Sequence, residues 1–300
     1  MTNTVTFIGL GTMGQPMVRN LARSVPVAVY DANPDAIDAA ARSDGVTPLA
    51  SPFDGAGADV VILMLPNSTV VQRVLGDLGD PESFASRLHP GALVVDMGSS
   101  APRATQEVAK QLREREVGMV DAPVSGGPRK AATAELTIMV GGPVEDYERA
   151  LPLLRTMGTS VTHVGSAGSA HALKALNNLL SAIGLVGALE VLTVGTKFGL
   201  DPRTMLDVIN RSTGRNQSTE VKIGPEVLDG RFRVGFSLPL TVKDITTALD
   251  LSSSVGLSPE VSQACVRFCQ AALAGLDEEN PDQSEIARYM AEMTGVDLTQ

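Results

Sequence analysis

The feature that most constrains this chain is a glycine-rich turn close to its start. Residues 5–10 form a short apolar run, and Gly9, Gly11 and Gly14 follow with the spacing GxGxxG, after which apolar residues recur at helical spacing over residues 13–21. This order predicts a strand, a tight turn and a helix. In such a turn the first glycine permits a sharp bend, the second lets the backbone approach a pyrophosphate, and the third lets helix and strand pack closely. The helix N-terminus favours negative charge, so the junction predicts a dinucleotide-binding site.

A second apolar run, residues 27–30, ends at Asp31. An acidic side chain about twenty residues past the glycines can accept hydrogen bonds from the adenosine ribose hydroxyls. It would repel a 2'-phosphate, and neither Ala32 nor Asn33 offers an arginine to bind one. The sequence therefore favours NAD over NADP. Asp31 could also be an ordinary N-cap before Asn33 and Pro34, which is compatible with a cofactor role.

The apolar runs along the first half indicate the fold class. Further strands are expected over residues 60–65, 93–96, 119–121 and 136–140, separated by helix-length segments such as residues 103–116. This alternation predicts a largely parallel sheet covered on both faces. After Gly165 only helical patterns follow, and 300 residues exceed what one hydrophobic core usually holds. We expect an α/β Rossmann-type N-terminal domain, residues 1–165, and an all-α C-terminal domain, residues 166–300, joined by a long interdomain helix.

Composition narrows the partners and the location. The formal net charge of -10 argues against nucleic acid as a partner. The start of the chain has no signal-peptide pattern, so we expect a cytoplasmic protein. The apolar run after Lys174 is uncharged only as far as Glu190 and contains two Asn, which we interpret as too short and too polar for a membrane span. Cys265 and Cys269 lack partners at metal-ligand spacing, so we expect buried free thiols and no metal.

The long helical run over residues 165–198 carries one lysine among apolar and small residues. Lys174 precedes Asn178 by four positions, so both side chains would lie on one helix face. A desolvated lysine loses proton affinity, which a general acid or base needs near neutral pH. Alternatively, Lys174 buries only its stem and extends its ammonium group to water.

A loop after the expected strand 119–121 has the residues to bind an anion. It reads DAPVSGGP from Asp121 and places a hydroxyl, Ser125, beside Gly126 and Gly127. Successive backbone N–H groups with a hydroxyl beside them can hold a carboxylate. A simple turn is the alternative interpretation.

Taken together, these residues resemble the β-hydroxyacid dehydrogenase family. The matching stretches span nearly the whole chain in the family's order and are FIGLGTMGQPMVRNL from Phe7, MLP at Met64, DAPVSGG, LTIMVGG from Leu136, the run from Gly168 to Asn178, and FSLPLTVKD ending at Asp244. The resemblance implies a dinucleotide-binding domain, a long connecting helix, and a helical domain that helps to form a homodimer or homotetramer. It also implies an NAD-dependent oxidation of a small 3-hydroxy acid, similar to 3-hydroxyisobutyrate, or the reverse reduction.

The resemblance assigns roles to individual residues. It makes Lys174 the catalytic lysine, Asn178 the substrate-orienting asparagine, and Ser125, Gly126 and Gly127 the loop that binds the substrate carboxylate. It places cofactor contacts on Gly9, Leu10, Gly11, Thr12, Met13, Gly14, Asp31, Leu65, Pro66 and Ser99, where relatives often carry Thr, and on Lys243, which helps to close the site. An exposed ion pair with Asp244 is the alternative for Lys243. His171, one turn before Lys174, could face the same pocket, but we expect a hydrogen-bonded structural histidine.

The chain departs from the family pattern in the loop after Gly127. The family continues GGxxGAxxGxL, whereas this chain reads GGPRKAATAEL, so Lys130 and Ala134 replace glycines. Arg129 and Lys130 could bind a second anionic group of the substrate or point to solvent. A semialdehyde reductase, a serine or threonine dehydrogenase, and a dinucleotide-binding regulator with a silent site remain alternatives. Imine-reducing relatives usually lack the lysine, so Lys174 argues against that chemistry.

Overall fold

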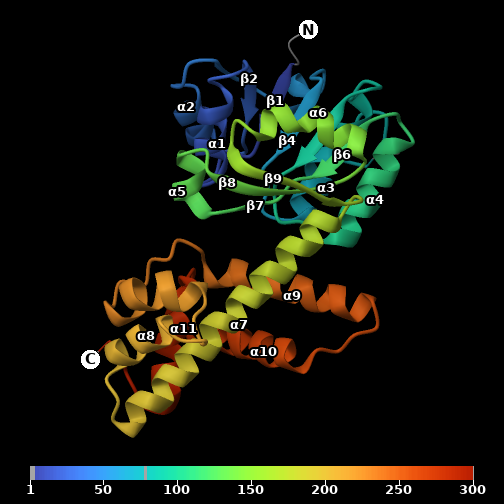
Figure 1. The fold of residues 1–300 in the computed structure, drawn as a ribbon. Helices are drawn as coiled ribbons and strands as arrows, with labels where there is room; N and C mark the ends of the chain where they lie inside the picture. Colours follow the sequence, from blue (N-terminus) through green and yellow to red (C-terminus); the bar gives the residue numbers. More distant parts are fainter. Residues whose placement is uncertain (1–3, 78–79, 300) are drawn as a thin grey trace. The chain divides into compact units, whose positions relative to one another are not determined.

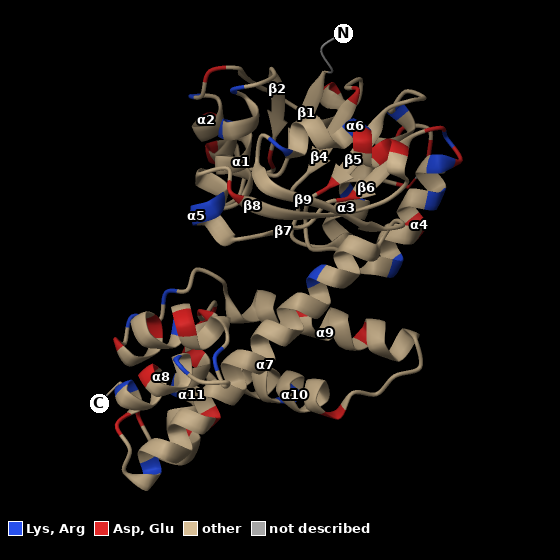
Figure 2. Cartoon of the chain, viewed as in Figure 1, with Lys and Arg blue, Asp and Glu red and all other residues tan. Residues whose placement is uncertain are grey.

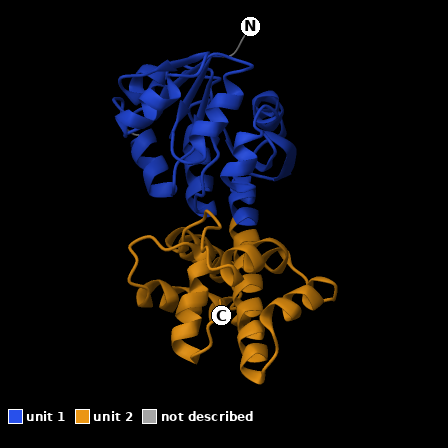
Figure 3. Ribbon diagram, turned by 90° about the vertical axis from the view of Figure 1, so that its left-hand side faces the viewer, with its two compact units in different colours: residues 1–174 blue, residues 175–300 orange. Residues whose placement is uncertain are grey.

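The chain, seen in a computed structural model that describes residues 4–77 and 80–299, divides into two compact units. Unit 1 is Met1–Lys174 and unit 2 is Ala175–Gln300 (Figure 3). The sequence led us to expect the first domain to end at residue 165. The division between the units falls inside helix α7 (Ser169–Phe198), which begins in unit 1 and continues into unit 2, and the domain boundary at residue 165 stays a prediction.

Unit 1 is built on one sheet with the strand order β3-β2-β1-β4-β5-β6-β8-β7, in which β9 pairs with β8. The pairs from β3 through β6 are parallel, β8 is antiparallel to β6 and β7, and β9 is parallel to β8. The predicted, largely parallel Rossmann-type sheet is therefore confirmed. The strands are β1 (Val5–Ile8), β2 (Val27–Tyr30), β3 (Val46–Pro48), β4 (Val60–Leu63), β5 (Leu93–Asp96), β6 (Gly118–Asp121), β7 (Val124–Ser125), β8 (Leu136–Gly141) and β9 (Gly158–Gly165).

Helices cover both faces of this sheet (Figure 1). Successive strand residues point to opposite faces, so Phe7 and Ile62 belong to one apolar core, and Ile8 and Leu63 to the other. The first core is closed by α1 (Gly14–Leu21), α2 (Pro34–Ala40), α5 (Gly127–Ala132) and α6 (Val144–Leu154), and the second by α3 (Ser68–Leu75) and α4 (Pro102–Arg113). Because both faces are buried, the central strands are apolar apart from Thr6 and the terminal Asp96 and Asp121, which is why the sequence revealed them.

Three strands were not expected from the sequence. Strand β3 lies at an edge of the sheet and β9 pairs with β8 alone, and both carry exposed or half-buried residues. Strand β7 has only two residues. Edge and very short strands lack a continuous apolar run, so the pattern that predicts buried strands does not detect them.

The regular elements that the structure describes in unit 2 are helices, apart from an isolated bridge between Ser237 and Asp282. Its elements after α7 are α8 (Pro202–Asn210), a π-helix labelled η3 (Thr219–Leu228), α9 (Leu238–Ser254), α10 (Glu260–Gly275), a short 3-10 helix labelled η4 (Gln283–Glu285) and α11 (Ile286–Thr294). Cys265 and Cys269 are free thiols buried in this core, as predicted. The all-α character predicted for this part of the chain is confirmed.

Helix α7 corrects one expectation. It has 30 residues, and its most apolar 18-residue window has a mean hydropathy of 1.8, so by length and composition it could cross a membrane. The interpretation that the run was too short was therefore wrong, because the helix continues past Glu190. Within the chain 39% of that window is buried. Core helices of soluble proteins meet the same criteria, so this finding alone is weak evidence for a membrane.

Candidate active site

The glycine turn has the geometry that its three glycines permit. Gly9 has φ +106°, and its N–H donates to the carbonyl of Tyr30 over 2.9 Å. A Cβ on Gly9 would collide with the Met64 carbonyl, and one on Gly14 would collide with the carbonyl of Gly9. A Cβ on Gly11 would meet no heavy atom within 4 Å, so the backbone there is open to a ligand. The turn therefore has room for the pyrophosphate of a dinucleotide, while cofactor contact by each turn residue stays a prediction.

Asp31 connects the end of β2 to this turn. One carboxylate oxygen accepts from the N–H of Leu10 over 2.6 Å, and the other accepts from the N–H of Asn33 over 2.8 Å. Helix α2 is capped by Asn33, whose side chain accepts from the N–H of Asp35 over 3.1 Å. The alternative interpretation of Asp31 as the N-cap is therefore wrong, and its half-buried carboxylate braces the glycine turn.

The remaining predicted cofactor residues in unit 1 lie at the ends of the next two strands. Leu65 is buried and Pro66 is exposed after β4, while Ser99 is half-buried after β5. Since β2, β1, β4 and β5 are parallel neighbours, their carboxyl ends share one edge of the sheet. Asp31, the glycine turn, Leu65 with Pro66, and Ser99 therefore follow one another along that edge, and together they fit an elongated dinucleotide.

The predicted carboxylate loop follows β7. Gly126 has φ +130° and Gly127 has φ +68°, conformations that L side chains rarely adopt. The side chain of Lys130 lies over Gly126, because a Cβ placed there would meet the Lys130 Cδ at 2.8 Å. Arg129 and Lys130 are exposed, and neither forms an ion pair within residues 4–77 and 80–299. Figure 2 shows α5 as a basic segment.

Helix α7 begins against a buried carboxylate. Gly168, with φ +85°, donates its N–H to Asp121 over 2.8 Å, and the N–H of His171 donates to the other Asp121 oxygen over 2.9 Å. Asp121 is the last residue of β6 and is fully buried. A carboxylate at a helix N-terminus satisfies N–H groups that lack partners within the helix. The half-buried Lys174 follows one turn later, at the end of unit 1.

Two further predicted residues belong to unit 2, and a third residue joins them. The Asn178 amide nitrogen donates to Asp244 over 2.6 Å, and the Lys243 ammonium lies 2.9 Å from the other Asp244 oxygen. The Asp244 side chain is 5% exposed and that of Lys243 is 27% exposed, so the pair is not an ordinary exposed ion pair.

Asp244 itself was not among the predicted site residues. A signal for it exists in the sequence, because residues 241, 244, 245 and 248 form the buried face of α9 and Asp244 is the charged member of that face. A charged side chain on a buried helix face needs a hydrogen-bond or ion-pair partner. That partner, Asn178, is 66 residues away.

Two family models match consecutive parts of the chain. Residues 4–165 match a model described as the NAD binding domain of 6-phosphogluconate dehydrogenase. Residues 168–290 match a model described as NAD-binding of NADP-dependent 3-hydroxyisobutyrate dehydrogenase. Together the two matches cover both units.

Characterised relatives cover most of the chain. It is 33% identical to 2-(hydroxymethyl)glutarate dehydrogenase of Eubacterium barkeri over 98% of this chain and 97% of that protein. It is 35% identical to NAD-dependent L-serine dehydrogenase of Pseudomonas aeruginosa, over 87% of this chain and 85% of that protein. A solved structure of Mycobacterium tuberculosis 3-hydroxyisobutyrate dehydrogenase with L-serine superposes with a TM-score of 0.86 at 31% identity, over 97% of this chain and 99% of that one.

The fold, the glycine turn and these similarities define a nicotinamide-dinucleotide-dependent dehydrogenase. The chain belongs to the β-hydroxyacid dehydrogenase family. It is an NAD-dependent oxidoreductase that acts on the CH–OH group of a hydroxy acid, as the sequence predicted.

Proposed function

We propose that the chain oxidises the hydroxyl group of a small 3-hydroxy acid, similar to 3-hydroxyisobutyrate, to an aldehyde or keto acid, or catalyses the reverse reduction. One observation carries this proposal. Lys174 and Asn178 lie four residues apart on the continuous helix α7, and Asn178 is held by Asp244. Residues at this spacing share a helix face, so a basic amine and an oriented carboxamide can serve one substrate.

The proposed roles follow from the chemistry of each group. Lys174 accepts the hydroxyl proton during oxidation and returns it during reduction. Asn178 orients the hydroxyl-bearing carbon, because its donation to Asp244 fixes the carboxamide plane. Ser125, Gly126 and Gly127 hold the substrate carboxylate with backbone N–H groups and the serine hydroxyl. Bound NAD⁺ supplies the hydride acceptor.

We infer that Asp31 and the glycine turn select NAD over NADP. The Asp31 carboxylate already holds the Leu10 N–H, so it has a fixed place at the end of β2. A negative charge at this point favours ribose hydroxyls and disfavours a 2'-phosphate. Leu65, Pro66, Ser99 and Lys243 complete the proposed set of cofactor contacts.

A second substrate class has its own support. Arg129 and Lys130 place two positive charges in α5 that have no ion-pair partner among the described residues, and the Lys130 stem lies over Gly126 of the proposed carboxylate loop. This arrangement favours a hydroxy acid with a second carboxylate. The Eubacterium barkeri relative is named for such a dicarboxylate. L-serine is a third candidate, because the Pseudomonas relative is named for it and the Mycobacterium structure contains it.

The decisive experiment measures NADH formation at alkaline pH, where removal of the released proton favours oxidation. The panel contains 3-hydroxyisobutyrate, 3-hydroxypropionate, L-serine, threonate and 2-(hydroxymethyl)glutarate, each with NAD⁺ and with NADP⁺. We expect activity with a 3-hydroxy acid and NAD⁺, and a kcat about 10²–10⁴-fold lower in Lys174→Met, because general-base catalysis is lost.

Three outcomes would count against these assignments. Turnover of none of the acids would favour a regulator with a silent site. Wild-type kcat in Lys174→Met would remove the lysine from the mechanism. A preference for NADP⁺ would overturn the role of Asp31.

We also infer a homodimer or homotetramer that resides in the cytoplasm. The stripe made by Leu176, Leu180, Val191, Val194 and Phe198 on α7 is 43–84% exposed, and these residues lie within about 60° of one another around the helix. Gly187, on the same face, would place no Cβ against this chain's own atoms, so a second helix can approach it closely. We propose that a second copy of the chain covers this stripe.

The buried free thiols support a reducing compartment, and cell fractionation tests the location.

A further inference from the structure

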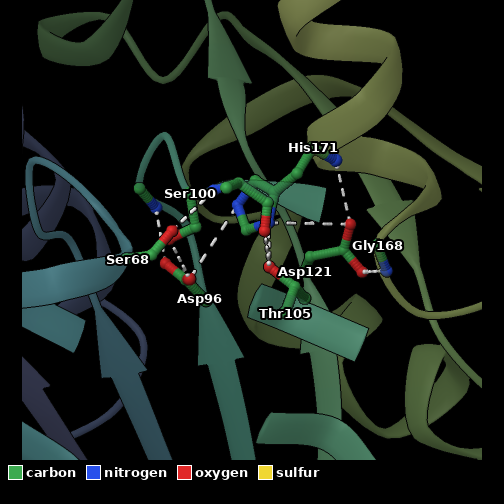
Figure 4. Close-up of polar contacts among 9 residues, drawn as sticks. Ser68, Asp96, Ser100, Thr105, Asp121, Gly168 and His171 are labelled. Atoms are coloured by element: carbon green, nitrogen blue, oxygen red, sulfur yellow. Dashed lines mark hydrogen bonds and ion pairs between the residues drawn. The ribbon is translucent and has the colours of Figure 1, made fainter. Parts of the chain in front are cut away.

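A buried polar cluster in unit 1 has no assigned role in the proposed reaction. Asp96 and Asp121 are register partners at the carboxyl ends of the neighbouring strands β5 and β6, and both are at most 1% exposed. His171, from the first turn of α7, lies between them and is also 1% exposed (Figure 4). A histidine enclosed by two carboxylates is an unusual occupant of a protein interior.

The imidazole ring contacts three separate elements. Its Nδ1 lies 2.8 Å from the Thr105 hydroxyl on α4 and 3.9 Å from an Asp121 oxygen. Its Nε2 lies 3.9 Å from an Asp96 oxygen and has no hydrogen-bond partner among the residues that the structure describes. The ring therefore lies between the two strand ends and the Thr105 hydroxyl.

Both carboxylates also shape neighbouring segments. Asp96 accepts from the N–H of Gly98 over 3.0 Å and from the Ser100 hydroxyl over 2.7 Å, on either side of the predicted cofactor residue Ser99. Asp121 accepts the two N–H groups at the start of α7 and lies four residues before Ser125. The cluster thus connects the segments that carry the predicted cofactor, carboxylate and proton-transfer residues of unit 1.

Backbone and side chain constrain different motions of α7. The two N–H groups bound to Asp121 hold the start of the helix at the end of β6. The buried His171 side chain projects outward from the helix, so its contacts also limit rotation of the first turn about the helix axis. Lys174 follows His171 by three residues, which places it about 60° around the helix from His171. The contacts of His171 therefore contribute to the direction in which Lys174 points.

We propose that His171 is a positioning residue for Lys174, and this inference rests on the proposed function. Packing alone does not explain the side chain. A leucine would fill similar volume without burying a ring nitrogen that lacks a hydrogen-bond partner, so an apolar residue would be the more stable choice for a purely structural site.

The test uses a double-mutant cycle in the full-length protein. His171→Leu keeps the volume and removes the polar contacts, whereas His171→Gln keeps an amide that can reach Thr105. We expect kcat to fall by up to about 100-fold in His171→Leu, as for a small misplacement of a reacting group. In His171→Gln we expect kcat to recover in part. The KM for NAD⁺ stays within about twofold. In a Lys174→Met background, His171→Leu lowers the residual rate no further, because its effect acts through Lys174.

The matched control is His163→Leu. His163 also belongs to unit 1, where it hydrogen-bonds to the Gly142 carbonyl over 2.8 Å and stacks near the Tyr147 ring, so kcat is expected to stay at the wild-type value. An equal loss of rate from His171→Leu in the wild-type and Lys174→Met backgrounds would overturn the positioning role and make His171 purely structural.

A second measurement separates this inference from the proposed function. The rate at which an amine-specific reagent labels Lys174, followed by peptide mass spectrometry, needs no substrate. We expect His171→Leu to change the Lys174 labelling rate several-fold while the labelling of Lys110 stays constant. An unchanged rate overturns the positioning role even if a substrate is turned over. An altered rate in a protein that oxidises no acid supports positioning and rejects the function.

Discussion

Asp244 joins two residues whose roles the family resemblance assigned separately. It accepts from the Asn178 amide and pairs with the Lys243 ammonium, so one buried carboxylate orients a proposed substrate group and a proposed cofactor group. A hydrogen bond to a charged group contributes about 1.5–3 kcal/mol, more than a neutral one. The carboxylate therefore holds both partners more firmly than a carboxamide would.

Asp244→Asn tests this arrangement. The variant keeps the shape of the side chain but leaves one acceptor oxygen where the carboxylate has two, so Asn178 and Lys243 can no longer both be held. We expect kcat to fall by about 10–100-fold, the range for slight misplacement of a reacting group. Asp250→Asn, an exposed change on the same helix, is the control and should leave kcat unaltered. Equal activity of the two variants would show that Asp244 does not organise the site.

Lys222 is another buried charged residue of unit 2, and it was not predicted from the sequence. It lies on the π-helix, is 6% exposed, and donates to the Ser181 hydroxyl over 3.1 Å and to Gln283 over 3.4 Å. Burial lowers the pKa of Lys222 below the ordinary 10.5, and the charge of Asp282 opposes this shift only in part. The unfolded chain therefore binds the proton more readily than the folded one, so Lys222 reduces stability at neutral pH.

Replacement of Lys222 by Met should stabilise the protein in a pH-dependent way. The destabilisation by Lys222 is fully present below its folded-state pKa and disappears as pH rises toward 10.5, where the unfolded lysine also loses its proton. We expect the stability difference between Lys222→Met and wild type to shrink from pH 7 to pH 10.5, as measured by urea unfolding. Lys110→Met, an exposed change on α4, should give a constant difference. A Lys222→Met effect that does not vary with pH would contradict this account.

At the level of elements, two positions in the segment after β7 replace glycines of the family pattern. The structure shows that their backbone conformations differ. Ala134 has φ +58°, a conformation that favours glycine, whereas Lys130 lies inside helix α5. The cost expected from replacing a glycine therefore applies to Ala134 alone. The departure at Lys130 changes charge and leaves the backbone in an ordinary helical shape.

Glycine substitutions at these two positions should have opposite effects. A left-handed alanine costs about 1–2 kcal/mol, and a glycine gains about 0.5–1 kcal/mol of extra disorder on unfolding, so Ala134→Gly should raise stability by up to about 1 kcal/mol. Lys130→Gly should lower stability by about 1 kcal/mol, because it introduces glycine into a helix. Thermal unfolding of both variants checks the signs. A loss of stability in both would mean that Ala134 is not strained.

At the level of the whole molecule, the exposed stripe on α7 determines the expected assembly. Leu180 and Val194 are about 70% exposed within the single chain, and burying such side chains against a second copy contributes about 1.5–3 kcal/mol for each. Introducing charge there should therefore break the interface.

We expect Leu180→Glu combined with Val194→Glu to convert a dimer or tetramer into monomers in sedimentation equilibrium. Val255→Glu is the control, since Val255 is 63% exposed and follows α9 instead of lying on the stripe. A monomeric wild-type protein would refute the proposed assembly. Retention of the oligomer in the double variant would place its interface elsewhere.

The sequence predicted most of the fold because its signals are local. The glycine turn and the apolar runs of β1, β4 and β5 each lie within a few residues, and parallel strands buried on both faces cannot avoid such runs. The partners of the site residues could not be predicted in this way. Asn178 contacts Asp244, and His171 contacts Thr105, each across 66 residues. Only the packing of helices brings these pairs into contact, and side-chain periodicity within one helix does not specify its neighbour.

The continuity of α7 limits which changes in length the gene can tolerate. A single residue inserted between Lys174 and Asn178 would turn every later side chain by about 100° and advance it by about 1.5 Å. Asn178 would then no longer lie on the same helix face as Lys174. An insertion in the loop at residues 277–282 would leave the spacing of Lys174 and Asn178 unchanged. Insertions and deletions among homologues should therefore be absent from this helix and accumulate in the loops of both units.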